Sequence, residues 1–121
     1  MQLVRGSMRR FGDLVLRRGS VFFEEIEVVD EPSTTGCYEA VDLNGSVLRS
    51  EIRTGSDVDG TVVATFVDVP LNLTTGLYGV GLDQDETDAF SASLTIGTAY
   101  FYVDDELLGS RNVRVKEPDE A

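Results

Sequence analysis

Short segments rich in β-branched and aromatic residues alternate with turn residues from about residue 20 to the end of the chain. Asp30-Glu31-Pro32-Ser33, Asn44-Gly45 and Asp104-Asp105-Glu106 are such turns. Strands separated by turns at roughly 8–12-residue spacing, with no amphipathic helix between them, are typical of an all-β sandwich. We therefore expect a single antiparallel β-sandwich of seven or eight strands with an extended N-terminal arm.

The expected strands are 20–29, 38–43, 46–53, 61–69, 77–82, 93–103 and 107–115. Asn44-Gly45 predicts a hairpin, and Pro70 is expected to end the fourth segment. The acidic segment Asp83–Asp88 is expected to be a loop. Gly79 and Gly81 alternate with apolar residues, which predicts the close approach of another backbone or of an aromatic ring.

Positive charge is concentrated at the N-terminus. The first eighteen residues hold five of the ten Lys and Arg residues and a single acid, Asp13, whereas the whole chain carries −12. The segment is therefore about +4 and the remainder about −16. We expect a basic arm over 1–18, a sandwich domain over 19–116 and an acidic tail over 117–121, although Arg17 and Arg18 also stand where the first core strand begins.

The composition argues against an enzyme. A chain of 121 residues has no histidine, so the commonest general base and metal ligand is missing. No glycine-rich phosphate loop or nucleophile motif is present, and we expect no cofactor. The acidic body should repel nucleic acid, and no apolar stretch is long enough to span a membrane. Cys37 is the single cysteine, which excludes an internal disulfide and suggests an inert, partly buried thiol.

Acidic loops suggest a weak calcium hypothesis. Asp57 and Asp59 precede Gly60 in part of an oxygen-ligand pattern, and the acids of Asp83–Asp88 alternate. Neither segment has a complete ligand set, and Asp-Gly is also ordinary turn chemistry.

The candidate partner-binding residues combine guanidinium groups with aromatic rings, as protein interfaces commonly do. In the arm, the alternatives are a solvated leader or a segment that docks on an acidic neighbour, including another copy of the chain. In the strand Tyr100-Phe101-Tyr102, at least one ring must point outward, where a sheet edge or another subunit could cover it. The candidates are Arg5, Arg9, Arg10, Phe11, Arg17, Arg18, Tyr100 and Tyr102.

Four segments carry a resemblance to a known family. Arg18-Gly19-Ser20-Val21-Phe22 is similar to an "R-G-D-T-F" opening, and Val41-Asp42-Leu43-Asn44-Gly45, with Ile52-Arg53 after it, to a "D-L-T-G … I-R" signature. Leu73–Tyr78 and Val113-Arg114-Val115 stand where the family has "G-x-Y" and "G-x-x-x-V". Over about residues 14–116, the chain resembles the immunoglobulin-like N-terminal domain of upper baseplate proteins of tailed phages.

This resemblance implies an immunoglobulin-like sandwich and a non-enzymatic structural role in the virion. Other virion structural proteins and further copies of the chain are the expected partners. Ser20 replaces the family's Asp, and the family's helical linker and receptor-binding platform have no counterpart here, so receptor recognition is not carried over. The alternatives are a capsid decoration protein and a calcium- or carbohydrate-binding adhesion module.

Overall fold

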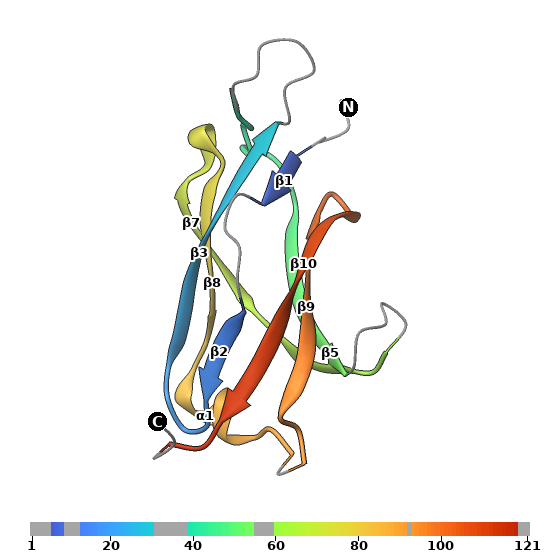
Figure 1. Ribbon diagram of the computed structural model, residues 1–121. Helices are drawn as coiled ribbons and strands as arrows, with labels where there is room; N and C mark the ends of the chain where they lie inside the picture. Colours follow the sequence, from blue (N-terminus) through green and yellow to red (C-terminus); the bar gives the residue numbers. More distant parts are fainter. Residues whose placement is uncertain (1–5, 9–12, 31–38, 55–59, 92, 119–121) are drawn as a thin grey trace.

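Two β-sheets pack face to face in the computed structural model, which describes residues 6–8, 13–30, 39–54, 60–91 and 93–118 (Figure 1). The first sheet contains β1 (Gly6–Met8), β3 (Phe22–Asp30), β4 (Glu39–Ala40), β7 (Val67–Asn72) and β8 (Leu77–Leu82). The second contains β2 (Leu14–Arg17), β5 (Leu48–Thr54), β6 (Val62–Thr65), β9 (Ile96–Val103) and β10 (Glu106–Lys116). The predicted all-β sandwich is confirmed.

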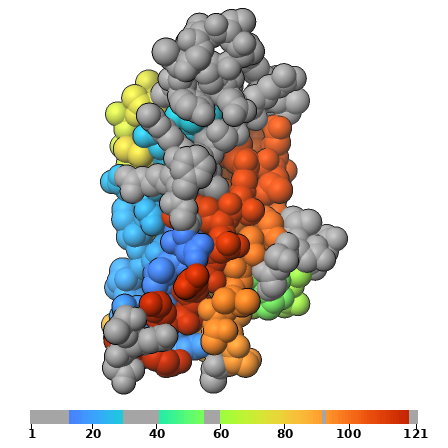
Figure 2. Space-filling model, viewed as in Figure 1, coloured from blue at the N-terminus to red at the C-terminus, as the bar shows by residue number. Residues whose placement is uncertain are grey.

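β1 and β7 are the edge strands of the first sheet, and β2 and β6 are those of the second. The first sheet runs β1-β3-β8-β7, with β4 also paired to β3, and the second sheet runs β2-β10-β9-β5-β6. Within the described residues every pairing is antiparallel except that of β2 with β10, which is parallel. Strands β2, β10 and β9 lie side by side on the face shown in Figure 2.

The core consists of the inward-facing side chains of both sheets. Phe101 stacks on Phe66 with 6.4 Å between ring centroids, and Phe22 lies 5.9 Å from Phe66. Offset aromatic pairs of this kind add to the free energy gained by burying the rings. The buried members of the core are Leu14, Leu16, Ile26, Val28, Leu43, Ile52, Phe66, Tyr78, Val80, Leu82, Phe90, Ala99, Phe101, Val103, Val113 and Val115.

The described residues form ten strands, more than the predicted seven or eight, for two reasons. β1 and β2 lie in the segment expected to be an arm, and the predicted strand 61–69 is two strands in different sheets. The chain changes sheets at Phe66, whose ring is buried and whose backbone N–H donates to the Ser50 carbonyl at 2.9 Å. Pro70 lies inside β7 instead of ending the preceding strand.

The prediction of a hairpin at Asn44-Gly45 is wrong, although the turn itself is present. Ser46 N–H donates to the Leu43 carbonyl at 3.0 Å, but the strands on either side belong to different sheets. Leu43 is fully buried and its N–H donates to the Leu73 carbonyl at 2.8 Å. Leu43 therefore contacts η1 (Leu73–Thr75), and the strands before and after the turn do not pair with each other.

The predicted acidic loop at Asp83–Asp88 is also wrong, because Gln84–Asp88 forms the short helix α1. The Asp83 carboxylate accepts a hydrogen bond from the Glu86 N–H at 2.7 Å, and the Glu86 carboxylate accepts one from the Asp83 N–H at 3.0 Å. This reciprocal capping box satisfies the free donors of the first turn. Two of the four carboxylates that suggested calcium ligands, those of Asp83 and Glu86, are therefore used in the helix cap.

Other local predictions are confirmed. β9 and β10 form the final hairpin, and Asp104 and Asp105 adopt φ of 51° and 64° at its turn. β8 has the predicted bounds, and the Phe23 ring packs directly over Gly79. A side chain on Gly79 would collide with that ring.

Gly76 and Gly45 form a matched pair for testing this fold. Both have φ near +76° to +79°, but a Cβ on Gly76 would collide with the Val28 and Val41 carbonyls, whereas Gly45 has open space around it. We expect Gly45→Ala to cost about 1 kcal/mol of backbone strain and Gly76→Ala about 3 kcal/mol or more, because the clash adds to the strain. Urea denaturation measures both, and equal losses would contradict this packing.

Candidate interaction surfaces

Strand β7 has its apolar side facing solvent. Val67, Val69 and Leu71 are 57%, 37% and 43% exposed. They alternate with Asp68, Pro70 and Asn72, and Asp68 lies opposite the core residue Val80. In a sandwich the apolar residues of a strand normally face the other sheet, so β7 is inverted relative to that pattern.

Phe23 extends this apolar surface across the sheet. Phe23 and Val67 both pair with Gly81, one from each side, and Glu25 and Val69 flank Gly79 in the same way. With no side chains on the glycines between them, the half-exposed Phe23 ring and the β7 valines form one surface. We call Phe23, Val67, Val69 and Leu71 the apolar stripe. Glu25 and Glu27 of β3 form its acidic border.

On the inward side of β7, the carboxylate of Asp68 is partly buried, which disfavours its charged form. Ser50, which is fully buried on β5, donates a hydrogen bond to an Asp68 carboxylate oxygen at 3.2 Å. Burial raises the pKa of Asp68, and the Ser50 hydrogen bond only partly opposes this. Burial raises the pKa of the neighbouring Tyr78, whose buried hydroxyl has no hydrogen-bond partner among the described residues, and the charge of Asp68 raises it further. A one-residue register shift would place the valines inside and Asp68 in water, yet the fold keeps the inverted register.

The outer face of the second sheet carries a paired charge cluster. The buried Glu51 carboxylate accepts from Arg49 at 2.8 Å and from Arg53 at 2.9 Å. The Arg49 guanidinium lies 3.9 Å from the centre of the Tyr102 ring. Tyr100 and Tyr102 are only 5% and 8% exposed. Their own chain therefore already covers the two predicted partner-binding tyrosines, while Phe101 points into the core.

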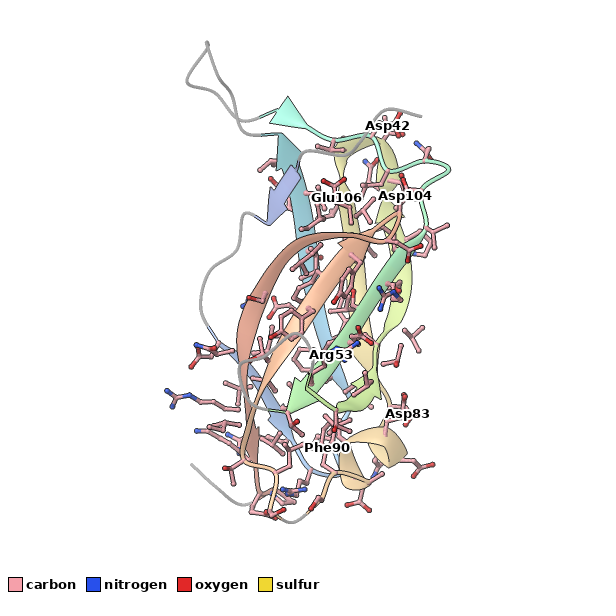
Figure 3. All side chains as sticks on the ribbon, turned by 90° about the vertical axis from the view of Figure 1, so that its right-hand side faces the viewer. Asp42, Arg53, Asp83, Phe90, Asp104 and Glu106 are labelled. Atoms are coloured by element: carbon pink, nitrogen blue, oxygen red, sulfur yellow. The ribbon has the colours of Figure 1, made fainter. Side chains whose placement is uncertain are left out.

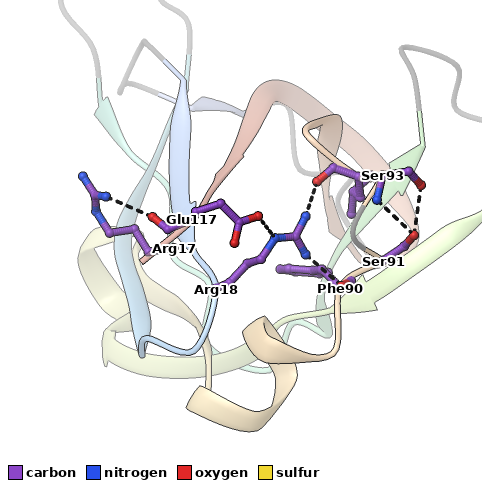
Figure 4. A network of polar contacts seen from close by, with 7 residues as sticks. Arg17, Arg18, Phe90, Ser91, Ser93 and Glu117 are labelled. Carbon is purple, nitrogen blue, oxygen red and sulfur yellow. Dashed lines mark hydrogen bonds and ion pairs between the residues drawn. The ribbon is translucent and has the colours of Figure 1, made fainter. Parts of the chain in front are cut away.

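Arg18 is a structural clamp and not a free partner-binding residue. It is 8% exposed, and its guanidinium donates to the Phe90 carbonyl, the Leu94 carbonyl and the Glu117 carboxylate at 2.7, 2.7 and 2.8 Å (Figure 4). Arg17 ends β2, and its guanidinium donates to the Glu117 carbonyl at 3.4 Å. Leu14–Arg18 therefore belongs to the sandwich, as the alternative interpretation of Arg17 and Arg18 expected.

The remaining candidates lie outside the described residues. These are the arm residues Arg5, Arg9, Arg10 and Phe11, the metal candidates Asp57 and Asp59, and Cys37. Within the described part of the chain, no group of three or more acidic, cysteine or histidine side chains could hold a metal ion.

A hollow of about 360 Å³ lies over β9 and β10. Its titratable side chains, Asp13 and Arg114, form an ion pair at 2.8 Å. The rest of its lining consists of Ile96, Gly97, Thr98, Asn112 and Val113. These lining residues do not form an arrangement of acid, base and nucleophile.

Charged side chains lie toward both ends of the sandwich. Asp42, Asp104 and Glu106 lie toward one end, and Asp83 and Phe90 toward the other (Figure 3). Among the described residues, no helix is long and apolar enough to cross a membrane.

Sequence reasoning missed the apolar stripe. The signal was available in the alternation of Val67, Val69 and Leu71 with polar residues or proline. That alternation identifies a two-sided strand but does not say which side faces the core.

Comparison with known proteins supports the fold. No protein-family model and no curated protein matches the chain. The crystal structure of the Lin-41 filamin domain matches with a TM-score of 0.51 and 10% identity, over 91% of this chain and 92% of that one. The crystal structure of the RIG-5 IG1 homodimer matches with a TM-score of 0.47 and 8% identity, over 92% of this chain and 97% of that one. The chain has an immunoglobulin-like fold.

Removing the Arg18 clamp should destabilise the protein. Arg18→Ala leaves two backbone carbonyls and a carboxylate without their charged donor, and we expect a loss of about 3 kcal/mol of unfolding free energy. Arg18→Lys should recover part of this, because an ammonium group cannot reproduce the guanidinium fork. Arg17→Ala is the control and should cost less than about 1 kcal/mol. Equal effects at positions 17 and 18 in chemical denaturation would contradict the clamp.

Asp68→Asn should stabilise the protein at neutral pH. Because the folded-state pKa of Asp68 is raised, the folded chain binds this proton more readily than the unfolded chain does. The side chain's contribution to stability is therefore greatest at low pH and falls as pH rises through that pKa.

We expect Asp68→Asn to have a higher Tm than the wild type at about pH 7, with the difference shrinking toward about pH 3, where both side chains are neutral. Asp105→Asn makes the same charge change at an exposed turn position and serves as the control. A stabilisation by Asp68→Asn that is independent of pH would exclude the burial of its charge as the cause.

Proposed function

We propose that this protein is a non-enzymatic structural subunit that docks onto other protein subunits through its N-terminal segment and an exposed sheet surface. The inverted strand β7 is the observation that carries this proposal. An edge strand that keeps a carboxylate half-buried and three apolar side chains in solvent is best explained by a partner that covers the apolar side.

The virion is the proposed setting, with a tail or baseplate position. The strand motifs that resemble upper baseplate domains of tailed phages support this part. A capsid decoration protein would use the same docking chemistry and differs only in its place in the particle. The adhesion alternative is less favoured, because Asp83 and Glu86, two of the four acids of Asp83–Asp88, are used in a helix cap.

Incorporation into particles tests the proposal. Purified particles of a phage that encodes this chain should contain the protein. Val69→Asp should abolish its incorporation, because a charge placed in the stripe cannot be buried against a partner without a large cost. Val47→Asp is the matched control, since Val47 is 66% exposed and lies just before β5, which belongs to the other sheet.

Circular dichroism should show that both variants are folded. Absence of the protein from the particles would overturn the virion setting. Incorporation of Val69→Asp at the level of Val47→Asp would overturn docking through the stripe.

A further inference from the structure

The exposed Asn44-Gly45 turn contains two groups that can react with each other. The side-chain amide of an asparagine can be attacked by the backbone nitrogen of the next residue, and a glycine in that position hinders the attack least because it has no β-carbon. Asn44 and Gly45 are both exposed, and Gly45 adopts φ of +79° with nothing within 4 Å of the position that a β-carbon would take. The turn is therefore open to water and has room for a ring to form.

The reaction proceeds through a cyclic imide. The Gly45 nitrogen attacks the side-chain carbonyl carbon Cγ of Asn44, so that a Cγ–N bond forms and the Cγ–Nδ2 bond breaks. The proton lost by the Gly45 nitrogen leaves with the amide nitrogen as ammonia. A water molecule then opens the succinimide at either of its carbonyl groups. The product at position 44 is aspartate or isoaspartate, and in both cases a neutral amide has become a carboxylate.

The Asn44 side chain is held by hydrogen bonds that oppose this reaction. Its amide nitrogen donates to an Asp42 carboxylate oxygen at 2.8 Å and to the Thr74 hydroxyl oxygen at 3.0 Å, and the same Asp42 oxygen accepts the Asn44 backbone N–H at 2.9 Å. A carboxylate only accepts hydrogen bonds, so the amide nitrogen must be the atom that faces Asp42. Because attack requires Cγ to rotate toward the Gly45 nitrogen, these bonds should slow the reaction.

Conversion would break this link and weaken the connection between the sheets. A carboxylate at position 44 has no N–H to donate, so both side-chain bonds are lost and a new negative charge faces Asp42. Isoaspartate also lengthens the backbone of the turn, which the Ser46 N–H closes on the Leu43 carbonyl at 3.0 Å. Leu43 is fully buried and its N–H donates to the Leu73 carbonyl, so the change reaches a core contact.

We propose that Asn44 is a self-modification site, at which the Gly45 nitrogen converts the asparagine to aspartate or isoaspartate at a rate set by the hydrogen bonds to Asp42 and Thr74. Water is the co-reactant and ammonia the leaving group. The folded protein thus carries a slow internal reaction whose product loosens the crossing from the first sheet to the second. This reaction does not depend on docking through the apolar stripe.

Peptide mapping by mass spectrometry tests the reaction in the full-length protein. Attack needs the Gly45 nitrogen to lose its proton, so conversion at position 44 should accumulate with time and should be faster at mildly alkaline pH than at mildly acidic pH. Asn72 and Asn112 are internal controls, since both are exposed but are followed by residues with bulky side chains. Conversion of Asn44 no faster than that of Asn72 and Asn112 would overturn the proposal.

The variants Thr74→Val and Thr75→Val test the control by hydrogen bonding. Thr74→Val removes an acceptor of the Asn44 amide, whereas the Thr75 hydroxyl donates instead to the Asn72 carbonyl at 3.1 Å. We expect several-fold faster conversion at position 44 in Thr74→Val, the wild-type rate in Thr75→Val, and the fastest conversion in wild-type protein unfolded in urea. Equal rates in the two variants, or in folded and unfolded wild type, would overturn the proposed role of these bonds.

Asn44→Asp reproduces one product and tests the structural consequence. It should have a lower Tm than Asn72→Asp, the matched control that adds the same charge at another exposed asparagine. A Tm equal to or above that of the control would show that conversion does not weaken the fold.

Discussion

The burial of Phe66 determines the surface that this protein presents. Its ring lies between Phe22 and Phe101 in the core, and its N–H bonds to the Ser50 carbonyl in the second sheet. With the chain anchored at that point, β6 ends in one sheet and β7 begins at the edge of the other. Because side chains alternate along a strand, the inward position of Phe66 directs Asp68 inward and Val67 and Val69 outward. The burial of Phe66 thus explains why the outward side of β7 is apolar.

Arginine has several roles in this chain, and burial distinguishes them. Arg18 ties the end of β2 to the Phe90–Leu94 segment and to Glu117. Arg49 and Arg53 share the buried carboxylate of Glu51, and Arg49 also covers Tyr102. These guanidinium groups stabilise the acidic sandwich from within, so they contribute to stability more than to recognition.

Local chemistry predicted many elements of this fold, whereas long-range contacts decided the rest. The alternation in 77–82 and the turn at Asp104-Asp105 were readable because they depend on neighbouring residues. The Asn44-Gly45 turn could also be predicted from the sequence. That it connects strands of different sheets depends on a contact with the distant Leu73, which the sequence does not reveal. Similarly, Arg18 looked like part of a basic arm because its three acceptors lie more than 70 residues away along the chain. The inverted face of β7 required knowledge of where Phe66 is buried.

The parallel pairing of β2 with β10 has a mechanical consequence. Both strands run the same way, so tension applied through the residues before Leu14 and those after Lys116 pulls them in opposite directions along their length. The ladder from Leu14–Val113 to Arg17–Lys116 is then loaded in shear, with its hydrogen bonds sharing the force, and the Arg18 contact with Glu117 reinforces its end. Antiparallel strands pulled from adjacent ends would instead separate one bond at a time. The β2–β10 ladder is thereby arranged to resist extension between Leu14 and Lys116.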